Sequence, residues 1–327
     1  MGNERQILIV TREFDPHADE MLLALRYMRQ DVVRLNLESI PTRSLFALDY
    51  NGTAWINKIV VDGRPINVER IGAVWWRRPG MYHLPDGLSQ IEAQFAIAEI
   101  NQAIHGFWGS MHCYWMSHPH AITTAQHNPE QLYRACHFGF TIPRTLVTTN
   151  PAQAHAFYES CAGKVVFRVM SDPALVVMEH DPASPEQVSH ATPATRLAQH
   201  HLEMLDSICM VPCMFQEAPP MISRLYVVLI EEHLFAVEAQ IQLVDGVEQE
   251  VAVEPVALDD ALAQQCIEYI RSYNLQFSVL TFMRTKHNQL LFTEHDPTGQ
   301  FMWIQHEVPT FHLIELMAQT LIDRANR

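Results

Sequence analysis

Short apolar runs alternate with amphipathic stretches through the first 120 residues. Apolar runs of this length, with polar residues on either side, predict buried strands. Asp15 before Pro16 predicts a helix N-terminus, because aspartate caps the first turn and proline fits the first helical position. The alternation predicts an α/β fold for this part of the chain. The predicted strands cover residues 6–11, 32–37 and 71–76, the predicted helices start at Asp15 and Ser89, and hairpin turns are predicted at Asn51-Gly52 and Asp62-Gly63.

Beyond residue 120 the pattern changes twice. Helix starts marked by Asn-Pro come first, and long runs of alternating polarity, which predict β-hairpins, follow them. We therefore expect three domains, over residues 1–120, 121–212 and 213–327, with the α/β part followed by a mixed α+β part. The predicted elements are helices starting at Asn128, Asn150 and Leu258, strands over residues 142–147 and 164–170, hairpins over residues 223–242 and 277–294, and a last helix capped by Thr310.

Composition and charge narrow the class of protein. The chain has 327 residues, of which 48% are hydrophobic and 18% charged, as in globular proteins. The net charge of −15 argues against a nucleic-acid-binding protein that relies on phosphate contacts. No apolar stretch is long enough for a transmembrane helix. The apolar run near the start is short, so we expect no signal peptide. The six scattered cysteines lack a Cys-x-x-Cys motif, so we expect a cytoplasmic protein without a membrane partner.

Two carboxylates stand where the last predicted hairpin ends. Glu294 and Asp296 are two residues apart, so a strand would place both side chains on one face. Pro297 ends the strand because it has no N–H for the ladder, and Gly299 permits a turn. Paired carboxylates at a strand end are one way to build an oxygen-ligand site for Mg²⁺ beside a phosphate. Two solvated acids at a strand terminus are the alternative interpretation.

A second candidate site lies at the end of the strand that starts at Ile71. This strand finishes in two tryptophans, which Arg77, Arg78 and a proline follow. Cations at the carboxyl edge of a strand suit contact with an anion or a peptide. Solvated cations at a strand end are the alternative. We take Arg77 and Arg78 as candidate peptide-binding residues.

The order of several motifs resembles the ATP-grasp ligases that cyclise ribosomal peptides, the microviridin or graspetide macrocyclases. The Trp-Arg-Arg-Pro strand end and the Gly-Phe-x-Ile-Pro-x-Thr-Leu stretch are fairly specific when they occur together. Order and spacing agree from about residue 70 to the end of the sequence, whereas residues 1–70 agree only in character. The matching stretches are residues 74–79, 139–151, 214–217, 223–225 and 292–299.

The resemblance implies a pre-ATP-grasp α/β domain followed by a two-lobed ATP-grasp fold, with ATP between the lobes and a precursor peptide as substrate. Enzymes of this kind phosphorylate a side-chain carboxylate of the peptide. A hydroxyl or amine of the same peptide then attacks the acyl phosphate, which gives an ω-ester or ω-amide. Such chemistry requires cations and Mg²⁺ around the transferred phosphoryl group and a site that excludes water.

The resemblance also assigns nucleotide-binding residues one by one. Gln216 and Glu217 match the hinge strand that holds adenine and ribose. Arg224 matches an arginine that faces the phosphates. Arg168 occupies the position of a lysine that contacts the α-phosphate. Arg168 and Arg224 are therefore both the candidate catalytic residues and part of the candidate ATP site.

The candidate metal ligands follow from the same comparison of motifs. Glu294 matches a glutamate that bridges the metal ions. Asp296 stands where these enzymes usually have a metal-binding asparagine, and a carboxylate at this position also suits Mg²⁺. Thr281 replaces an acid in the preceding strand, so one expected metal ligand is lost.

Other positions depart from the pattern as well. Arginine for lysine at position 168 keeps a cation but is not conservative at a tight site. A phosphate-covering loop needs glycine for close approach of its backbone amides, and residues 171–175 contain none. The remaining departures are His127 or Asn128 in place of a second lysine, and residues 245–247 in place of an Asp-Trp-Arg sequence.

These substitutions leave two hypotheses, and they leave open whether the chain is an active enzyme. The first is a divergent peptide-modifying ligase that uses ATP and Mg²⁺. The second is a degenerate ATP-grasp protein that binds a peptide or a partner enzyme without ATP-dependent catalysis. Another ATP-dependent carboxylate–amine ligase is a third class with the same implied fold. The resemblance also leaves open a homodimer or a partner maturase.

Overall fold

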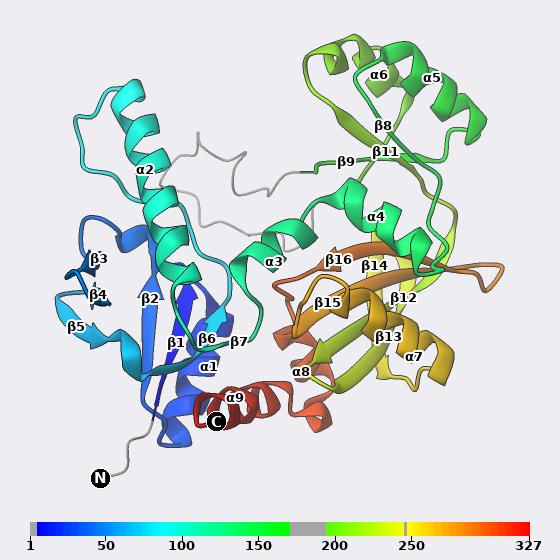
Figure 1. Ribbon diagram of the computed structural model, residues 1–327. Helices are drawn as coiled ribbons and strands as arrows, with labels where there is room; N and C mark the ends of the chain where they lie inside the picture. Colours follow the sequence, from blue (N-terminus) through cyan, green and yellow to red (C-terminus); the bar gives the residue numbers. More distant parts are fainter. Residues whose placement is uncertain (1–4, 171–193, 245–246) are drawn as a thin grey trace.

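The computed structural model describes residues 5–170, 194–244 and 247–327. Its first part contains a parallel sheet in the order β2-β1-β6-β7 (Figure 1). Every residue of β6 is buried, as expected for a parallel strand covered on both faces. The predicted α/β fold of this part is confirmed. The strands are β1 (Gln6–Thr11), β2 (Val32–Asn36), β6 (Ile71–Trp76) and β7 (Tyr114–Trp115).

Helices of this part begin where the sequence predicts. Asp15 caps α1 (Pro16–Tyr27), since its Oδ1 accepts from the backbone N–H of His17 at 3.1 Å. Ser89 forms a capping box with Glu92 at the start of α2 (Gln90–Gly109). The first half of α2 extends above the sheet in Figure 1.

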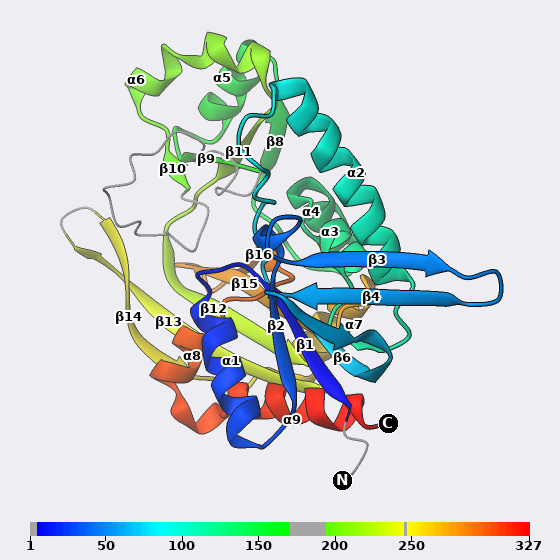
Figure 2. The ribbon, with the colours of Figure 1, turned by 90° about the vertical axis from the view of Figure 1, so that its left-hand side faces the viewer.

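The segment between β2 and β6 forms a separate antiparallel sheet in the order β3-β4-β5. The predicted turns are present: Gly52 and Gly63 adopt φ of 95° and 78°, values that favour glycine. The β3–β4 hairpin extends away from the body of the molecule in Figure 2. Its strands are β3 (Leu45–Tyr50), β4 (Trp55–Val61) and β5 (Arg64–Asn67).

A third sheet, in the order β10-β9-β11-β8, forms a middle lobe at the upper right of Figure 1. This lobe has its own small core, in which Phe215 packs with residues from the helix after β8. β11 pairs with β8 and β9, so this sheet extends to Glu217. Its elements are β8 (Thr145–Thr148), α5 (Pro151–Ser160), β9 (Val165–Arg168), β10 (Thr195–Arg196), α6 (Gln199–Leu202) and β11 (Cys213–Glu217).

The third part is an antiparallel sheet in the order β14-β13-β12-β15-β16. Leu225, Phe282 and Phe292 from one face lie in the same core cluster as residues of α4 and α7. Both predicted hairpins are present, but β14 was not predicted. The elements are α3 (Pro119–Ala125), α4 (Asn128–His137), β12 (Met221–Ile230), β13 (His233–Val244), β14 (Val247–Pro255), α7 (Asp260–Arg271), β15 (Phe277–Thr285) and β16 (Leu290–Asp296).

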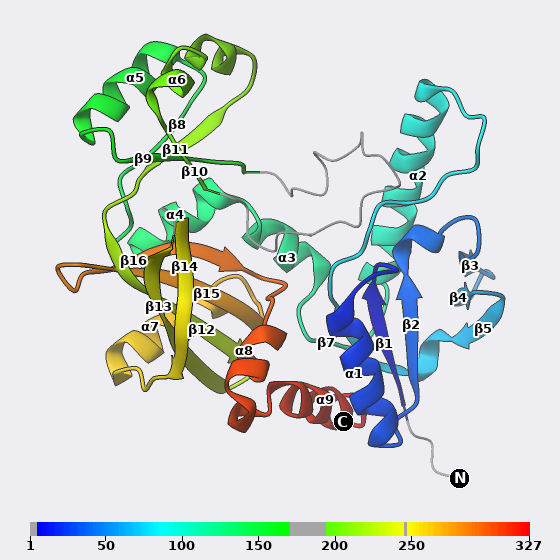
Figure 3. The same ribbon diagram turned by 180° about the vertical axis from the view of Figure 1, so that it is seen from behind.

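The chain ends on the N-terminal sheet. After α8 (Met302–Glu307), helix α9 (Leu313–Ala325) lies beside α1 and against β1 and β6 (Figure 3). Leu313, Met317 and Leu321 are fully buried, as the predicted helix face requires. The predicted cap at Thr310 is wrong, because Thr310 lies in the 3₁₀ turn Pro309–Phe311 and the helix follows His312. This return of the chain ties the first and third parts together.

Some sequence predictions fall on segments that the structure does not describe. Residues 171–175, where the resemblance places a phosphate-covering loop, lie outside the described residues, as do Asp245 and Gly246. Across the described ranges, no helix is long and apolar enough to cross a membrane.

Candidate functional site

One face of the C-terminal sheet holds most of the candidate residues. Arg224 and Tyr226 of β12, Thr281 of β15 and Glu294 of β16 occupy facing positions of the ladder. We call this surface, together with Asp296 at the end of β16, the interlobe face. His295 points to the opposite face and is 2% exposed, so Glu294 and Asp296 share one face as the spacing predicts.

Arg168 of the middle lobe reaches the interlobe face. Its Nη2 donates to Oε2 of Glu294 at 3.2 Å, and its Nη1 donates to the backbone carbonyl of Thr293 at 3.0 Å. Nη1 also lies 3.3 Å from Oε1 of Gln216. The side chain is buried, and its Nε has no hydrogen-bond partner among the described residues. Arg168 therefore connects the middle lobe to the C-terminal sheet, and its buried Nε–H is left to donate to another acceptor.

The two hinge candidates lie at the end of β11. Gln216 is 3% exposed, and its Nε2 donates to Oγ1 of Thr145 at 3.1 Å. The backbone N–H of Glu217 donates to the carbonyl of Arg144 at 2.8 Å. Gln216 thus holds Arg168 on one side and the first strand of the middle lobe on the other.

Arg224 is paired with a glutamate from the neighbouring edge of the sheet. Its Nη1 donates to Oε1 of Glu250 on β14 at 2.7 Å. The hydroxyl of Tyr226 donates to the same oxygen at 2.5 Å. Sequence reasoning missed both Glu250 and Tyr226. For Glu250 the signal is only the alternation of polar and apolar residues along β14.

Asp296 is held in a turn and in an ion pair. Its Oδ1 accepts from the backbone N–H groups of Thr298 and Gly299, both at 2.9 Å. Its Oδ2 accepts from Nη2 of Arg78 at 2.7 Å. Burial raises the pKa of this carboxyl, but Arg78, Arg77 and the bonds from Thr298 lower it, and the net pKa is about 2. Both oxygens of Asp296 are already engaged, which leaves them poorly placed to bind a metal ion.

The two arginines at the end of β6 hold this turn. Arg78 donates from Nε to Oγ1 of Thr298 at 2.9 Å, and Nη1 of Arg77 donates to the carbonyl of Thr298 at 2.8 Å. Arg77 is 2% exposed, and burial lowers its pKa to about 10 although Asp15 opposes the shift. In this structure Arg77 is therefore not accessible to a peptide, and Arg78 faces the turn. Thr298 was not singled out from the sequence.

The side chains around Glu294 offer Mg²⁺ one carboxylate ligand and not several. Within the described ranges, no group of three or more His, Cys, Asp or Glu side chains lies close enough to hold a metal ion. Thr281 stands opposite Glu294 and brings no carboxylate. The side chain of Glu294 is 35% exposed, and the ion pair with Arg168 engages its Oε2. Mg²⁺ commonly uses one or two carboxylates together with substrate phosphates, and Glu294 meets that requirement.

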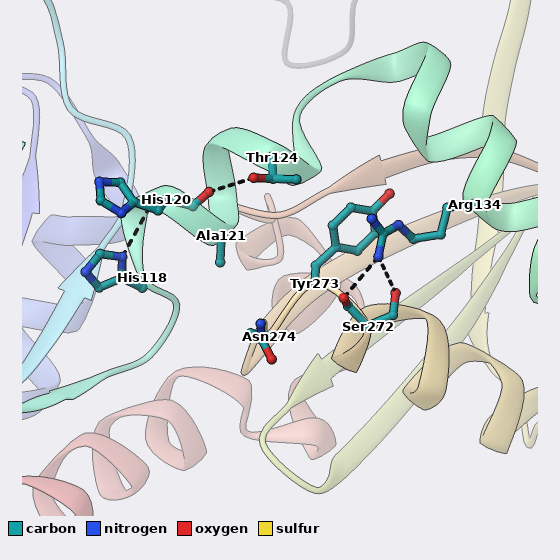
Figure 4. Close-up of a pocket in the computed structure, with 8 residues that line it drawn as sticks. All are labelled: His118, His120, Ala121, Thr124, Arg134, Ser272, Tyr273 and Asn274. Carbon is teal, nitrogen blue, oxygen red and sulfur yellow. Dashed lines mark hydrogen bonds between the residues drawn. The ribbon is translucent and has the colours of Figure 1, made fainter. Parts of the chain in front are cut away.

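A pocket of about 390 Å³ lies elsewhere, between α3 and the loop after α7 (Figure 4). Arg134 on its wall donates from Nη1 to the carbonyl and the hydroxyl of Ser272, at 3.0 and 3.1 Å. Nδ1 of His118 accepts from the backbone N–H of His120 at 3.3 Å. No candidate residue from the sequence lines this pocket.

Comparisons with known proteins agree with the implied fold. Residues 6–123 match the family described as "MvdD pre-ATP grasp domain", and no curated protein matches the chain. The macrocyclase MdnC from Microcystis aeruginosa MRC, bound with precursor peptide MdnA, has a TM-score of 0.82 at 22% identity over 97% of this chain and 99% of that chain. A RiPP-associated ATP-grasp ligase from Chryseobacterium gregarium, in complex with ADP and a leader and core peptide, has a TM-score of 0.80 at 20% identity over 98% of this chain and 97% of that chain.

The chain therefore has a pre-ATP-grasp domain followed by an ATP-grasp fold, and the predicted fold class is confirmed. The resemblance stated from the motifs is confirmed at the level of the fold. The same architecture occurs in macrocyclase MdnB from Microcystis aeruginosa MRC, which has a TM-score of 0.81 at 23% identity over 97% of this chain and 99% of that chain.

Proposed function

We propose that the chain is an ATP-grasp ligase that modifies a ribosomally made precursor peptide. It would activate a side-chain carboxylate of the peptide as an acyl phosphate and join it to a hydroxyl or amine of the same peptide as an ω-ester or ω-amide. The observation that carries this proposal is the meeting of Arg168, Gln216 and Glu294. These residues come from three separate segments, each assigned to one nucleotide site by its motif.

The cationic residues would act on the nucleotide phosphates. Arg168 has a buried Nε without a partner among the described residues, which suits a phosphate oxygen as acceptor. Arg224 would face the phosphates from β12. Charged donors in a partly buried site stabilise the charge that develops on a transferred phosphoryl group. Gln216 and Glu217 would border the adenine and ribose from the hinge.

Glu294 would hold Mg²⁺, which supplies neutralising charge to the phosphates when it is bound. Asp296 would support this carboxylate by fixing the turn that follows it, since its own oxygens bond to Arg78 and to Thr298 and Gly299. We further propose that residues 1–120 form the pre-ATP-grasp domain, and that the two lobes divide after Glu217. A precursor peptide is the proposed partner, because the similar MdnC was crystallised with one.

Nucleotide binding is the first test. Mg·ATP and Mg·ADP are titrated into the purified chain by calorimetry, together with Glu294→Ala and the control Glu254→Ala from an exposed position of β14. We expect binding that Glu294→Ala weakens at least tenfold and that Glu254→Ala leaves unchanged. A folded protein that binds no nucleotide at millimolar concentration contradicts the ligase.

Activation of a peptide carboxylate is the second test. A precursor peptide is incubated with the chain, ATP and Mg²⁺, and hydroxylamine is added as a trap for the acyl phosphate. We expect a hydroxamate on the peptide with the trap, and without it a peptide that has lost one water for each new ring. Peptide binding without nucleotide binding would instead support the degenerate binding protein.

A further inference from the structure

Two arginines at the interlobe face are each neutralised by a glutamate from another strand. Arg168 of β9 pairs with Glu294 of β16, and Arg224 of β12 pairs with Glu250 of β14. β14 and β16 stand at opposite ends of the sheet order, so the two carboxylates approach from opposite sides. A phosphate that reaches this face therefore meets two arginines, each of which already has a glutamate as its counter-ion.

The pair between Arg224 and Glu250 is held in place by an aromatic neighbour. Tyr226 donates its hydroxyl to the Oε1 that also accepts from Arg224. The ring of Tyr226 packs edge-on against Trp303, with 4.8 Å between ring centroids. The side chains of Arg224 and Glu250 are 35% and 27% exposed, so an incoming anion can reach both. Glu250 is thus fixed at the arginine without being sealed from solvent.

We propose that Glu250 competes with the phosphates of the nucleotide for Arg224 and so lowers the affinity of the site for nucleotide. The proposal rests on the proposed function, because it concerns the same arginine. When a polyphosphate binds, the Arg224 guanidinium exchanges a carboxylate oxygen for a phosphate oxygen, and Glu250 is released towards solvent. No covalent bond changes, and one anionic partner replaces another.

A competing carboxylate and a supporting carboxylate give opposite effects when they are removed. A supporting residue holds the arginine in its working position, so its loss weakens phosphate binding. A competing residue must be displaced, so its loss strengthens binding. Partly exposed ion pairs contribute little in water, which sets the expected gain at about twofold to fivefold.

The test compares Glu250→Gln with the parent chain. Gln keeps the shape of the side chain and removes its charge, and Glu254→Gln on the same strand is the matched control. ADP and inorganic tripolyphosphate, each without Mg²⁺, are titrated by calorimetry. We expect both ligands to bind about twofold to fivefold tighter to Glu250→Gln, with no change in the control. Tyr226→Phe removes one anchor of Glu250 and should produce a smaller change in the same direction.

The outcomes separate this proposal from the function on which it rests. If the parent binds nucleotide and Glu250→Gln binds equally or more weakly, the competition is overturned and the ligase stands. If neither protein binds ADP or tripolyphosphate without Mg²⁺, the competition is overturned, and the ligase is overturned as well only if Mg·ADP also fails to bind. If Glu250→Gln binds these ligands and the parent chain does not, the competition is supported, because Glu250 then keeps the ligands away from Arg224 in the parent.

Discussion

Nη2 of Arg78 lies 2.7 Å from Oδ2 of Asp296, although 218 residues separate the two in the sequence. This ion pair joins the end of β6 in the pre-ATP-grasp domain to the turn after β16. Arg77 strengthens the same connection through the carbonyl of Thr298. The turn begins at Asp296, two residues after Glu294, so the N-terminal domain fixes the backbone next to the proposed metal ligand.

Arg78→Gln should therefore destabilise the protein and weaken metal-dependent nucleotide binding. The change leaves a partly buried carboxylate without its counter-ion, which costs about 1–3 kcal/mol in the free energy of unfolding. Urea unfolding measures this loss, and calorimetry measures the Mg²⁺ concentration that half-saturates ADP binding. Arg43→Gln breaks an exposed pair with Glu13 and should change stability by less than about 1 kcal/mol. Equal losses in the two variants would show that the connection is an ordinary surface contact.

Thr281→Asp should increase the affinity for Mg²⁺. Thr281 stands directly opposite Glu294 in the ladder, so an aspartate there brings a second carboxylate to the interlobe face. Repulsion between the two acids should lower stability by about 0.2–1 kcal/mol without metal. The readout is the Mg²⁺ concentration needed for half-maximal ADP binding, which should fall severalfold. Thr281→Asn is the uncharged control, and an equal effect of this variant would sink the prediction.

Arg168 should separate stability from nucleotide affinity. Arg168→Lys keeps the charge but cannot contact Gln216, Thr293 and Glu294 together. The free energy of unfolding should therefore fall by about 1–2 kcal/mol. Nucleotide affinity should stay within about threefold of the parent, because a cation remains near the phosphates. Arg168→Ala should lose both properties, with binding at least tenfold weaker in calorimetry. Retained binding in Arg168→Ala would remove this residue from the proposed site.

Local signals predicted the elements well where a specific residue sets their boundary. Asp15, Ser89 and the two Asn/Asp-Gly turns fix their elements through hydrogen bonds or glycine conformations within a few residues. The start of α9 was wrong because the residue before this helix is His312 with φ of 50°, a conformation that gives no clear signal in the sequence. β14 was missed because three glutamates make it look polar, although its apolar residues alternate.

The sequence identified residues of the candidate site, but not the residues that they contact. The motifs identified Arg168, Gln216 and Glu294, which the fold brings together. The contacts of Arg77 with Thr298 and of Arg78 with Asp296 could not be deduced, because these partners lie more than 200 residues away along the chain and depend on how the domains pack. For the same reason Glu250 had no signal of its own: its role follows from a neighbour on another strand.

His295 gives a prediction about pH. It is 2% exposed, its ring packs against Tyr269 and Tyr273, and neither ring nitrogen has a hydrogen-bond partner among the described residues. Burial lowers the pKa of this imidazole to about 3, with Asp296 opposing the shift and Arg134 adding to it. In the unfolded chain the imidazole titrates near its ordinary pKa of about 6.5. Below that pH the unfolded state binds a proton that the folded state does not.

The free energy of unfolding should therefore fall as the pH falls from 7 towards 3. The stabilising contribution of His295 should be fully present above about pH 6.5. At about 1.4 kcal/mol per pH unit, His295 alone lowers the free energy of unfolding by about 2 kcal/mol between pH 7 and pH 5. Urea unfolding of the parent chain, His295→Phe and His295→Gln at these two pH values checks this. Both variants should lack that part of the slope, whatever their stability at pH 7, since other groups titrate alike in all three proteins. A slope that stays the same in both variants would mean that His295 is protonated in the folded protein.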